Sequence, residues 1–315
     1  MAKADVKDNR FPRPKPLATH GPARIIAMCN QKGGVGKTTS TMNIAAALAE
    51  YGRKVLLVDF DPQGALSAGL GINAYTDEPT VYNLLIDRNQ QTRDVIKSTS
   101  VANLDILPAN IDLSAAELQL VTEMGREKAL QRALKQVVDD YDVIIVDCQP
   151  SLGLLTVNAL AAAHGVIIPL ATEFFALRGV KLLEDIIERV KENTNPALQI
   201  DGILATLYDS RTLHSREVLE RVRERFGDKL LRSVIARTVK FPDATVAGQP
   251  ITQFAPDSQA AESYRTVARE LVERNVAVEL VIAAVERGID DHRGREQRQC
   301  PARAPVERGH ARTGP

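Results

Sequence analysis

The segment that most constrains the fold is the glycine-rich run at residues 31–39, Gln-Lys-Gly-Gly-Val-Gly-Lys-Thr-Thr. An apolar stretch at residues 24–29 precedes it, and residues 38–51 have the pattern expected of a helix. Glycines let successive backbone N–H groups curl around phosphate oxygens without Cβ clashes. The start of a helix adds the positive end of its dipole. A strand, this loop and a helix in that order predict a phosphate-binding loop.

Two side chains of this loop suit phosphate and metal binding. Lys37 can reach the β- and γ-phosphates, and the Thr38 hydroxyl can ligate Mg²⁺. The usual pattern has glycine five residues before the pair Gly36 and Lys37, but this chain has Gln31 there, followed by a second lysine, Lys32. The alternative, a glycine-rich turn with incidental lysines, requires all these features to coincide by chance. We expect a nucleoside triphosphate site, and the lack of an Asn-Lys-x-Asp motif argues against GTP.

Short apolar runs alternate with amphipathic stretches along most of the chain. The candidate strands are residues 24–29, 54–59, 104–107, 142–147, 165–170, 200–207 and 230–236. The candidate helices are residues 38–51, 113–121, 127–138, 154–163, 177–191, 215–226 and 258–273. This alternation predicts a single α/β domain of the P-loop NTPase class, with a mostly parallel twisted sheet and helices on both faces.

Both ends of the chain differ in composition from its middle. Residues 1–22 contain four prolines among charged residues, and residues 288–315 are rich in Arg, Gly and Pro without periodicity. We predict a disordered N-terminal arm at 1–22, the P-loop domain at 23–287 and a disordered tail at 288–315.

Charge and cysteine usage exclude several classes of protein. The formal net charge is zero, and residues 25–287 carry 28 basic and 34 acidic residues, so any DNA binding requires a local patch. The spacing of Cys29, Cys148 and Cys300 fits neither a disulfide framework nor a zinc site, which favours reduced thiols in a cytosolic protein. We find no secretory signal and no apolar run long enough to span a membrane.

Carboxylates end two of the predicted strands. Asp59 and Asp61 leave one strand tip, and Asp147 leaves another. Beside a phosphate loop, such carboxylates suit the positioning of water and the binding of Mg²⁺. An apolar strand that ends in Asp is the Walker B arrangement, in which Asp147 would hold Mg²⁺ through water and Thr38. A solvated acidic turn is the structural alternative for the first pair.

A basic segment lies further along the chain. Residues 209–240 hold nine Lys or Arg and five acids, an excess that could follow a nucleic-acid backbone without reading its sequence. Glu217, Glu220 and Glu224 also permit a solvated helix face with Glu–Arg pairs, and composition alone favours that second interpretation.

The run Lys-Gly-Gly-Val-Gly-Lys-Thr-Thr at residues 32–39 resembles the deviant Walker A motif of the ParA/MinD ATPases, closest to the chromosomal ParA (Soj) branch. The resemblance extends over roughly residues 24–273. It implies that Lys32 reaches across a dimer interface to the partner's nucleotide, so that ATP and Mg²⁺ support a sandwich homodimer. It also implies that Arg237 lies near the adenine. The implied nucleotide contacts are Lys32, Gly33, Gly34, Val35, Gly36, Lys37, Thr38, Thr39 and Arg237.

The acidic motifs resemble the family's switch regions. By this resemblance Asp61 orients the attacking water, Asp59 supports the metal shell, and Lys32, Lys37 and Asp61 form the catalytic set, with Thr38, Asp59 and Asp147 as the metal set. The family usually has Pro-Pro after the Walker B Asp, whereas this chain has Gln149 and a single proline. Nitrogenase iron proteins share the fold and hold an Fe–S cluster with two cysteines per chain. Cys148 alone is suitably placed here, so we expect a plain thiol.

Two basic segments resemble the DNA-binding regions of the Soj-like branch. Residues 207–212, Leu-Tyr-Asp-Ser-Arg-Thr, and residues 235–240, Ile-Ala-Arg-Thr-Val-Lys, place Arg211 and Lys240 at the matching positions. The second segment departs from the family pattern at Ala236 and Thr238. The resemblance implies non-specific DNA binding through Arg211 and Lys240.

The leading prediction is therefore a cytoplasmic, nucleoid-associated ATPase for chromosome partitioning, whose hydrolysis a ParB-like partner stimulates. About 23 polar residues precede the first strand, which leaves no room for an N-terminal helix-turn-helix domain. A MinD-like membrane-positioning ATPase is the first alternative, although the tail lacks the apolar face of a membrane-binding helix, so we expect no stable membrane association. The second alternative is a ParA-like protein that positions another cargo.

Overall fold

A mostly parallel sheet forms the centre of the chain. The computed structural model describes residues 11–75, 78–173, 176–274 and 314. Within these residues the strands are β1 (Arg24–Met28), β2 (Val55–Phe60), β3 (Lys97–Ser98), β4 (Leu104–Leu107), β5 (Val143–Cys148), β6 (Gly165–Ala171), β7 (Gln199–Tyr208) and β8 (Leu230–Ala236). Their order in the sheet is β3-β4-β2-β5-β1-β6-β7-β8. All neighbouring pairs are parallel except β3 with β4.

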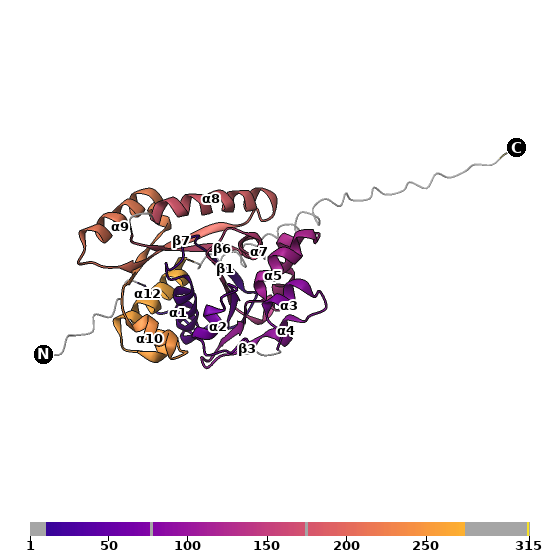
Figure 1. Ribbon diagram of the computed structural model, residues 1–315, viewed down its shortest axis with the longest axis horizontal. Coiled ribbons are helices and arrows are strands. Elements are labelled where there is room, and N and C mark those ends of the chain that lie inside the picture. Colours follow the sequence, from indigo (N-terminus) through magenta and orange to yellow (C-terminus); the bar gives the residue numbers. More distant parts are fainter. Residues whose placement is uncertain (1–10, 76–77, 174–175, 275–313, 315) are drawn as a thin grey trace. The chain divides into compact units, whose positions relative to one another are not determined.

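Helices cover the sheet on both sides. In the described chain they are α1 (Lys37–Glu50), α2 (Ala65–Gly69), α3 (Val81–Ile86), α4 (Thr92–Val95), α5 (Leu113–Gln119), α6 (Ala129–Leu134), α7 (Leu154–Ala162), α8 (Ala176–Asn193), α9 (Leu213–Phe226), α10 (Lys240–Val246), α11 (Ile251–Phe254) and α12 (Gln259–Arg274). Figure 1 shows α8 and α9 on one side of the strands and α1, α10 and α12 on the other. This layered arrangement confirms the predicted fold class.

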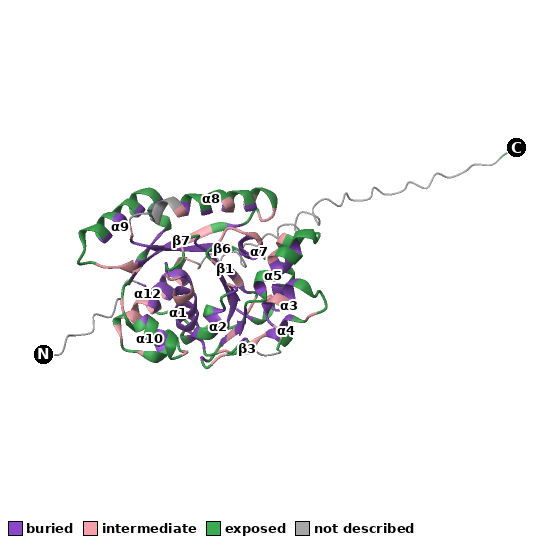
Figure 2. Cartoon of the chain, viewed as in Figure 1, coloured by how far each residue is buried: buried purple, intermediate pink, exposed green. Residues whose placement is uncertain are grey.

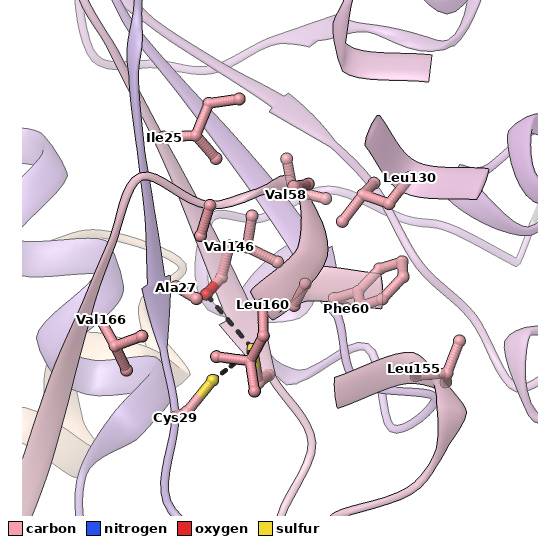
Figure 3. Packing of buried hydrophobic residues seen from close by; sticks show 14 of the residues in the cluster. Ile25, Ala27, Cys29, Val58, Phe60, Leu130, Val146, Leu155, Leu160 and Val166 are labelled. Carbon is pink, nitrogen blue, oxygen red and sulfur yellow. Dashed lines mark hydrogen bonds between the residues drawn. The ribbon is translucent and has the colours of Figure 1, made fainter. Parts of the chain in front are cut away.

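The core lies between the strands and these helices (Figure 2). Every residue of β2 and β6 is buried, as expected for strands that carry helices on both faces. One large apolar cluster joins alternate residues of the central strands to α3, α5, α6 and α7, and Figure 3 shows part of it. Alternation places the next residue of each strand on the opposite face, where α1 packs against β2 and β5.

The predicted cysteine chemistry agrees with the environment of two of the three thiols. Cys29 and Cys148 are free and buried within the apolar cluster, and their sulfur atoms lie 3.0 Å apart. Cys29 is labelled in Figure 3. Burial raises the pKa of the Cys148 thiol well above its usual range, with the neighbouring Cys29 as a further cause. Cys300 lies outside the described residues.

All seven predicted strands are present, and each predicted end lies within one residue of the observed end. The short elements β3, α2, α3, α4, α10 and α11 have no counterpart in the prediction. They span between two and seven residues each, too few for hydrophobic periodicity to stand out. The helix predicted at 127–138 is shorter, since α6 covers only Ala129–Leu134 and is flanked by 3-10 turns.

Residues 11–22, part of the arm predicted over 1–22, make several hydrogen bonds to the domain. Arg53 donates a hydrogen bond to the carbonyl of Lys15 (2.7 Å). The carboxylate of Asp142 accepts from the amide of Gly21 (3.0 Å) and contacts the ring of His20 (2.7 Å). Partners more than 100 positions away supply the contacts at Asp142, so local composition could not reveal them.

The remaining predicted boundaries fall largely outside the described residues. Residues 1–10 and the tail at 288–315, Gly314 excepted, are not described, so their disorder stays a prediction. Residues 1–271 form one compact unit and Val272–Pro315 a second, of which residues 272–274 and 314 are described. None of the helices in the described part of the chain has the length and apolar character needed to cross a bilayer.

Candidate functional site: a phosphate loop and two buried carboxylates

The predicted phosphate loop connects the end of β1 to the start of α1. Gly34 and Gly36 have φ angles of +71° and +81°, which L side chains rarely adopt. A Cβ atom added at Gly33 or Gly34 would meet nothing within 4 Å in the described part of the chain, so the space beside these two glycines is open. The loop therefore has the shape of a cradle that can receive phosphate oxygens on backbone N–H groups.

Two residues that sequence reasoning missed hold this loop in place. Asn30, which is buried, donates to the carbonyl of Pro169 (2.6 Å) and accepts from the amide of Lys32 (2.9 Å). Thr206 on β7 donates to the carbonyl of Val35 (2.8 Å). Asn30 is directly adjacent to the motif and so was a possible candidate. Thr206 is 171 positions away and carries no local signal.

The two lysines of the loop occupy different environments. Lys37 is buried, with 7% of its surface exposed, and its ammonium lies 3.3 Å from the carbonyl oxygen of Lys32. The side chain of Lys32 is 41% exposed and its ammonium pairs with Glu173 at 2.6 Å. Lys37 thus belongs to the interior of its own loop, whereas Lys32 points to a surface carboxylate.

Glu173 is a further site residue that the sequence prediction missed. It follows β6, and its second carboxylate oxygen lies 3.2 Å from the guanidinium of Arg237. The hydrogen bond from Lys32 is the main cause that lowers the pKa of Glu173. Glu173 therefore brings together two residues that were predicted separately as nucleotide contacts.

The structure also brings Asp59 and Asp147 together. They occupy paired positions on the neighbouring strands β2 and β5, and each has at most 1% of its surface exposed. Burial is the main cause that raises the pKa of each carboxyl to about 7. The charge of Asp147 adds to the effect on Asp59, while the hydroxyl of Thr38 and the charge of Lys37 oppose the shift at Asp147.

The hydrogen bonds of these two carboxylates differ. Asp59 accepts from both the amide (2.8 Å) and the hydroxyl (2.7 Å) of Ser67 through one oxygen. Asp147 accepts from the hydroxyl of Thr41 (3.1 Å) through Oδ1, and its other oxygen, although buried, has no hydrogen-bond partner among the residues that the structure describes. A buried carboxylate oxygen without a donor, beside a threonine hydroxyl and a phosphate cradle, fits the oxygen ligands that Mg²⁺ prefers.

Asp61 lies beyond the end of β2 and is partly exposed. Its carboxylate accepts from the amide of Gln63 at 3.0 Å, a local turn that orients the side chain. Its amide donates to Asp59 at 3.4 Å, so the two acidic residues belong to one hydrogen-bonded turn. The role of Asp61 in water positioning stays a prediction.

The predicted DNA-binding residues lie on exposed parts of the described chain. Arg211 is 86% exposed and forms a two-pronged pair with Asp209, with Nε–Oδ1 and Nη2–Oδ2 distances of 2.9 and 2.8 Å. The hydrogen bonds from Arg211 lower the pKa of Asp209 to about 2. Lys240 is exposed at the first residue of α10. Arg211 is therefore partly neutralised by its own neighbour.

Comparison with known proteins assigns this site to a family. The profile described as AAA domain matches residues 23–200, more than half of the chain. An uncharacterised protein of Mycobacterium tuberculosis is 59% identical over 264 residues, which cover 84% of this chain and 83% of that protein. The sporulation initiation inhibitor protein Soj of Bacillus subtilis is 46% identical over 248 residues, 79% of this chain and 98% of Soj. This chain belongs to the ParA/MinD family of P-loop ATPases, close to the Soj branch.

A solved structure extends the comparison of this ParA/MinD family member to the nucleotide site. The cobyrinic acid a,c-diamide synthase from Mycobacterium smegmatis, determined with bound ADP and magnesium, has a TM-score of 0.69 and 44% sequence identity. The match covers 78% of this chain and 92% of that one.

Proposed function

We propose that this chain is a ParA-type ATPase for DNA partitioning that binds and hydrolyses ATP with Mg²⁺. Curated relatives named Soj and ParA chromosome partitioning proteins support the assignment. The observation that carries it is the contrast between Lys37, buried in its own phosphate loop, and Lys32, half-exposed and held outside that loop. This is the arrangement expected of a lysine that serves a second copy of the chain.

Each site residue has a role in this proposal. The open loop at residues 33–36 and Lys37 bind the phosphates, and the Thr38 hydroxyl together with Asp147 holds Mg²⁺. Bound there, Mg²⁺ would neutralise charge that develops on the β- and γ-phosphates. Asp61 orients the water that attacks the γ-phosphorus. Asp59, paired in register with Asp147, supports the metal shell through its buried charge.

The ATP-bound protein would form a sandwich dimer. Lys32 of each protomer would leave Glu173 and stabilise the charge on the phosphoryl group bound by its partner, as an arginine finger does in other P-loop enzymes. Arg237, which also pairs with Glu173, would then be free to approach the nucleotide base. Light scattering should give a dimer with ATP for Asp61→Ala and a monomer for the same variant with Lys32→Ala added.

The dimer would bind DNA without sequence preference through Arg211 and Lys240. Two protomers double the number of phosphate contacts, so DNA affinity should rise on dimerisation and fall steeply with salt. The Asp209 partner of Arg211 would be exchanged for a DNA phosphate. In the cell this would associate the protein with the nucleoid until a ParB-like partner, through a short basic peptide, stimulated hydrolysis.

Retention of the ATP-bound protein on DNA tests this face. Arg211→Glu combined with Lys240→Glu should abolish retention at moderate salt. Arg223→Glu is a matched control, since Arg223 lies on α9 and pairs with Glu220 in an exposed contact. Unchanged retention in the double variant would show that DNA binds elsewhere or not at all.

Partner identity separates this proposal from its two alternatives. A pull-down with Asp61→Ala and ATP should recover a ParB-like protein, whereas a different adaptor would indicate another cargo. Co-sedimentation with liposomes in the presence of ATP would support the MinD-like alternative. Hydrolysis assays with ATP and GTP should show a preference for ATP, and the reverse preference would contradict the proposed nucleotide.

A further inference from the structure

Gln149 marks a departure from the family pattern that the proposed function leaves unused. It follows Asp147 by two positions, in the loop that joins β5 to α7. Proline at such a position fixes φ near about −65° and restricts the loop. Glutamine lacks that restriction, but its side-chain amide donates to the carboxylate of Glu117 on α5 at 3.2 Å. A hydrogen bond to a charged group thus stands where the family has a ring constraint.

Glu117 makes a second contact with the same connection. The oxygen that accepts from Gln149 also accepts from the backbone amide of Leu155 at 3.2 Å. Leu155 is in the first turn of α7, whose N-cap residue, Gly153, has no side chain to cap the helix. Glu117 therefore caps α7 from another helix, and its negative charge suits the positive end of the helix dipole.

The space around Gly153 is shaped by Glu117. A Cβ atom at Gly153 would lie 2.4 Å from the Glu117 oxygen, closer than such atoms approach. The φ angle of Gly153 is −78°, which any residue adopts, so backbone conformation does not require glycine there. A side chain at this position would therefore have to displace the Glu117 carboxylate, which is the mobile end of its side chain.

The connection between β4 and α5 is also joined, through Ser67, to the second buried carboxylate, Asp59. Ser67, which donates its hydroxyl to Asp59, accepts a hydrogen bond from the amide of Ala109 at 3.2 Å. Ala109 follows β4 and is close to the start of α5 in sequence. The segment from Ala109 to Glu117 thus contacts Ser67, the hydrogen-bond partner of Asp59, at one end. At its other end it contacts the loop that follows Asp147.

We propose that Glu117 is a positioning residue of the ATPase site. It holds the loop after Asp147 through Gln149 and aligns that loop with Asp59 and its partner Ser67. The proposal rests on the ATPase activity proposed above. Glu117 touches neither phosphate nor metal in this scheme. It acts through the loop, so its removal should slow the chemical step while the phosphate cradle still binds ATP.

The test compares Glu117→Ala, Glu117→Gln and Gln149→Ala in ATP hydrolysis. Loss of a hydrogen bond to a charged group from a site aligned for catalysis should lower kcat about tenfold in Glu117→Ala and about fivefold in Gln149→Ala. KM for ATP should change by less than about twofold, because the contacts that bind ATP equally in the ground state and in the transition state are unchanged. Glu117→Gln retains an acceptor oxygen and should restore most of kcat.

Two further variants separate positioning from helix capping. Glu123→Ala removes an exposed carboxylate that pairs with Arg88 just beyond α5 and should leave kcat unchanged. Gly153→Ala should displace Glu117 without removing it and reproduce the kcat loss. If Gln149→Ala left kcat unchanged, Glu117 would serve only as a cap of α7 and the positioning proposal would be wrong.

Hydrogen exchange without nucleotide provides a readout that does not depend on ATP hydrolysis. Amides of residues 151–156 should exchange faster in Glu117→Ala and Gln149→Ala than in the unmodified protein or Glu123→Ala. Unmodified protein that hydrolysed no ATP would refute the proposed function, and the exchange rates would still decide whether Glu117 holds the loop. Equal exchange in all four proteins would overturn the inference.

Discussion

Thr206 offers a direct test of how the sheet supports the phosphate loop. Its side chain is buried, and its hydroxyl donates to the carbonyl of Val35 at 2.8 Å. Val35 has 1% of its surface exposed, so water cannot replace a lost donor without rearrangement. Thr206→Val preserves the shape of the side chain and removes this one hydrogen bond.

The expected cost follows from leaving a buried carbonyl without a partner. Such a group costs about 1–3 kcal/mol, more than the roughly 1 kcal/mol net value of an average hydrogen bond. We therefore expect Thr206→Val to lower the free energy of unfolding by about 1–3 kcal/mol. Part of this loss should appear as weaker nucleotide binding, by about three- to tenfold, because the loop loses a contact that holds it in the binding conformation.

Urea unfolding and titration with a fluorescent ATP analogue measure the two effects. Thr206→Ser is the matched control, since it retains the hydroxyl and should bind nucleotide with nearly the affinity of the unmodified protein. If Thr206→Val matched the unmodified protein in both stability and nucleotide affinity, the bond to Val35 would contribute nothing and the reasoning would be refuted.

Two further predictions concern charged groups. Glu173→Gln should leave the melting temperature nearly unchanged, because exposed ion pairs contribute about 0–1 kcal/mol, yet light scattering should detect dimers at lower ATP concentration, since Lys32 no longer has to leave a carboxylate. A higher ATP requirement would mean that Glu173 assists dimerisation. Burial, followed by the charge of Arg24, lowers the pKa of His164, whose ring nitrogen accepts from the amide of Ile25 at 2.9 Å. The unfolded chain therefore binds the proton more readily, and stability should fall as pH decreases through about 6.5 towards the lower folded pKa. The difference in urea midpoint between the unmodified protein and His164→Asn should shrink over that range, and a constant difference would exclude this residue as the cause.

Local sequence was sufficient for the phosphate loop and for most of the sheet. The glycines, Lys37 and Thr38 act through the conformation of consecutive residues, so their spacing predicted the cradle. Continuous apolar runs predicted the buried strands for the same reason. The short elements α2, α3 and α10 were missed, because one or two turns carry too little periodicity.

Tertiary structure decided which distant residues surround that loop. Asp59 and Asp147 were each predicted, but only the pairing of β2 with β5 places them at matching positions and raises the pKa of both. Glu173 and Glu117 had no signal at all, since each acts through partners more than 30 positions away.

The difference between what local sequence determined and what tertiary structure decided has one physical cause. A phosphate loop is built from backbone geometry, which the residues of a short segment determine among themselves. The carboxylates, Thr206 and Glu117 gain their roles from strand order and from the angle at which helices pack, and these depend on burial summed over the whole chain. The sequence by itself therefore determined where the phosphate loop lies, and the fold decided which side chains support it.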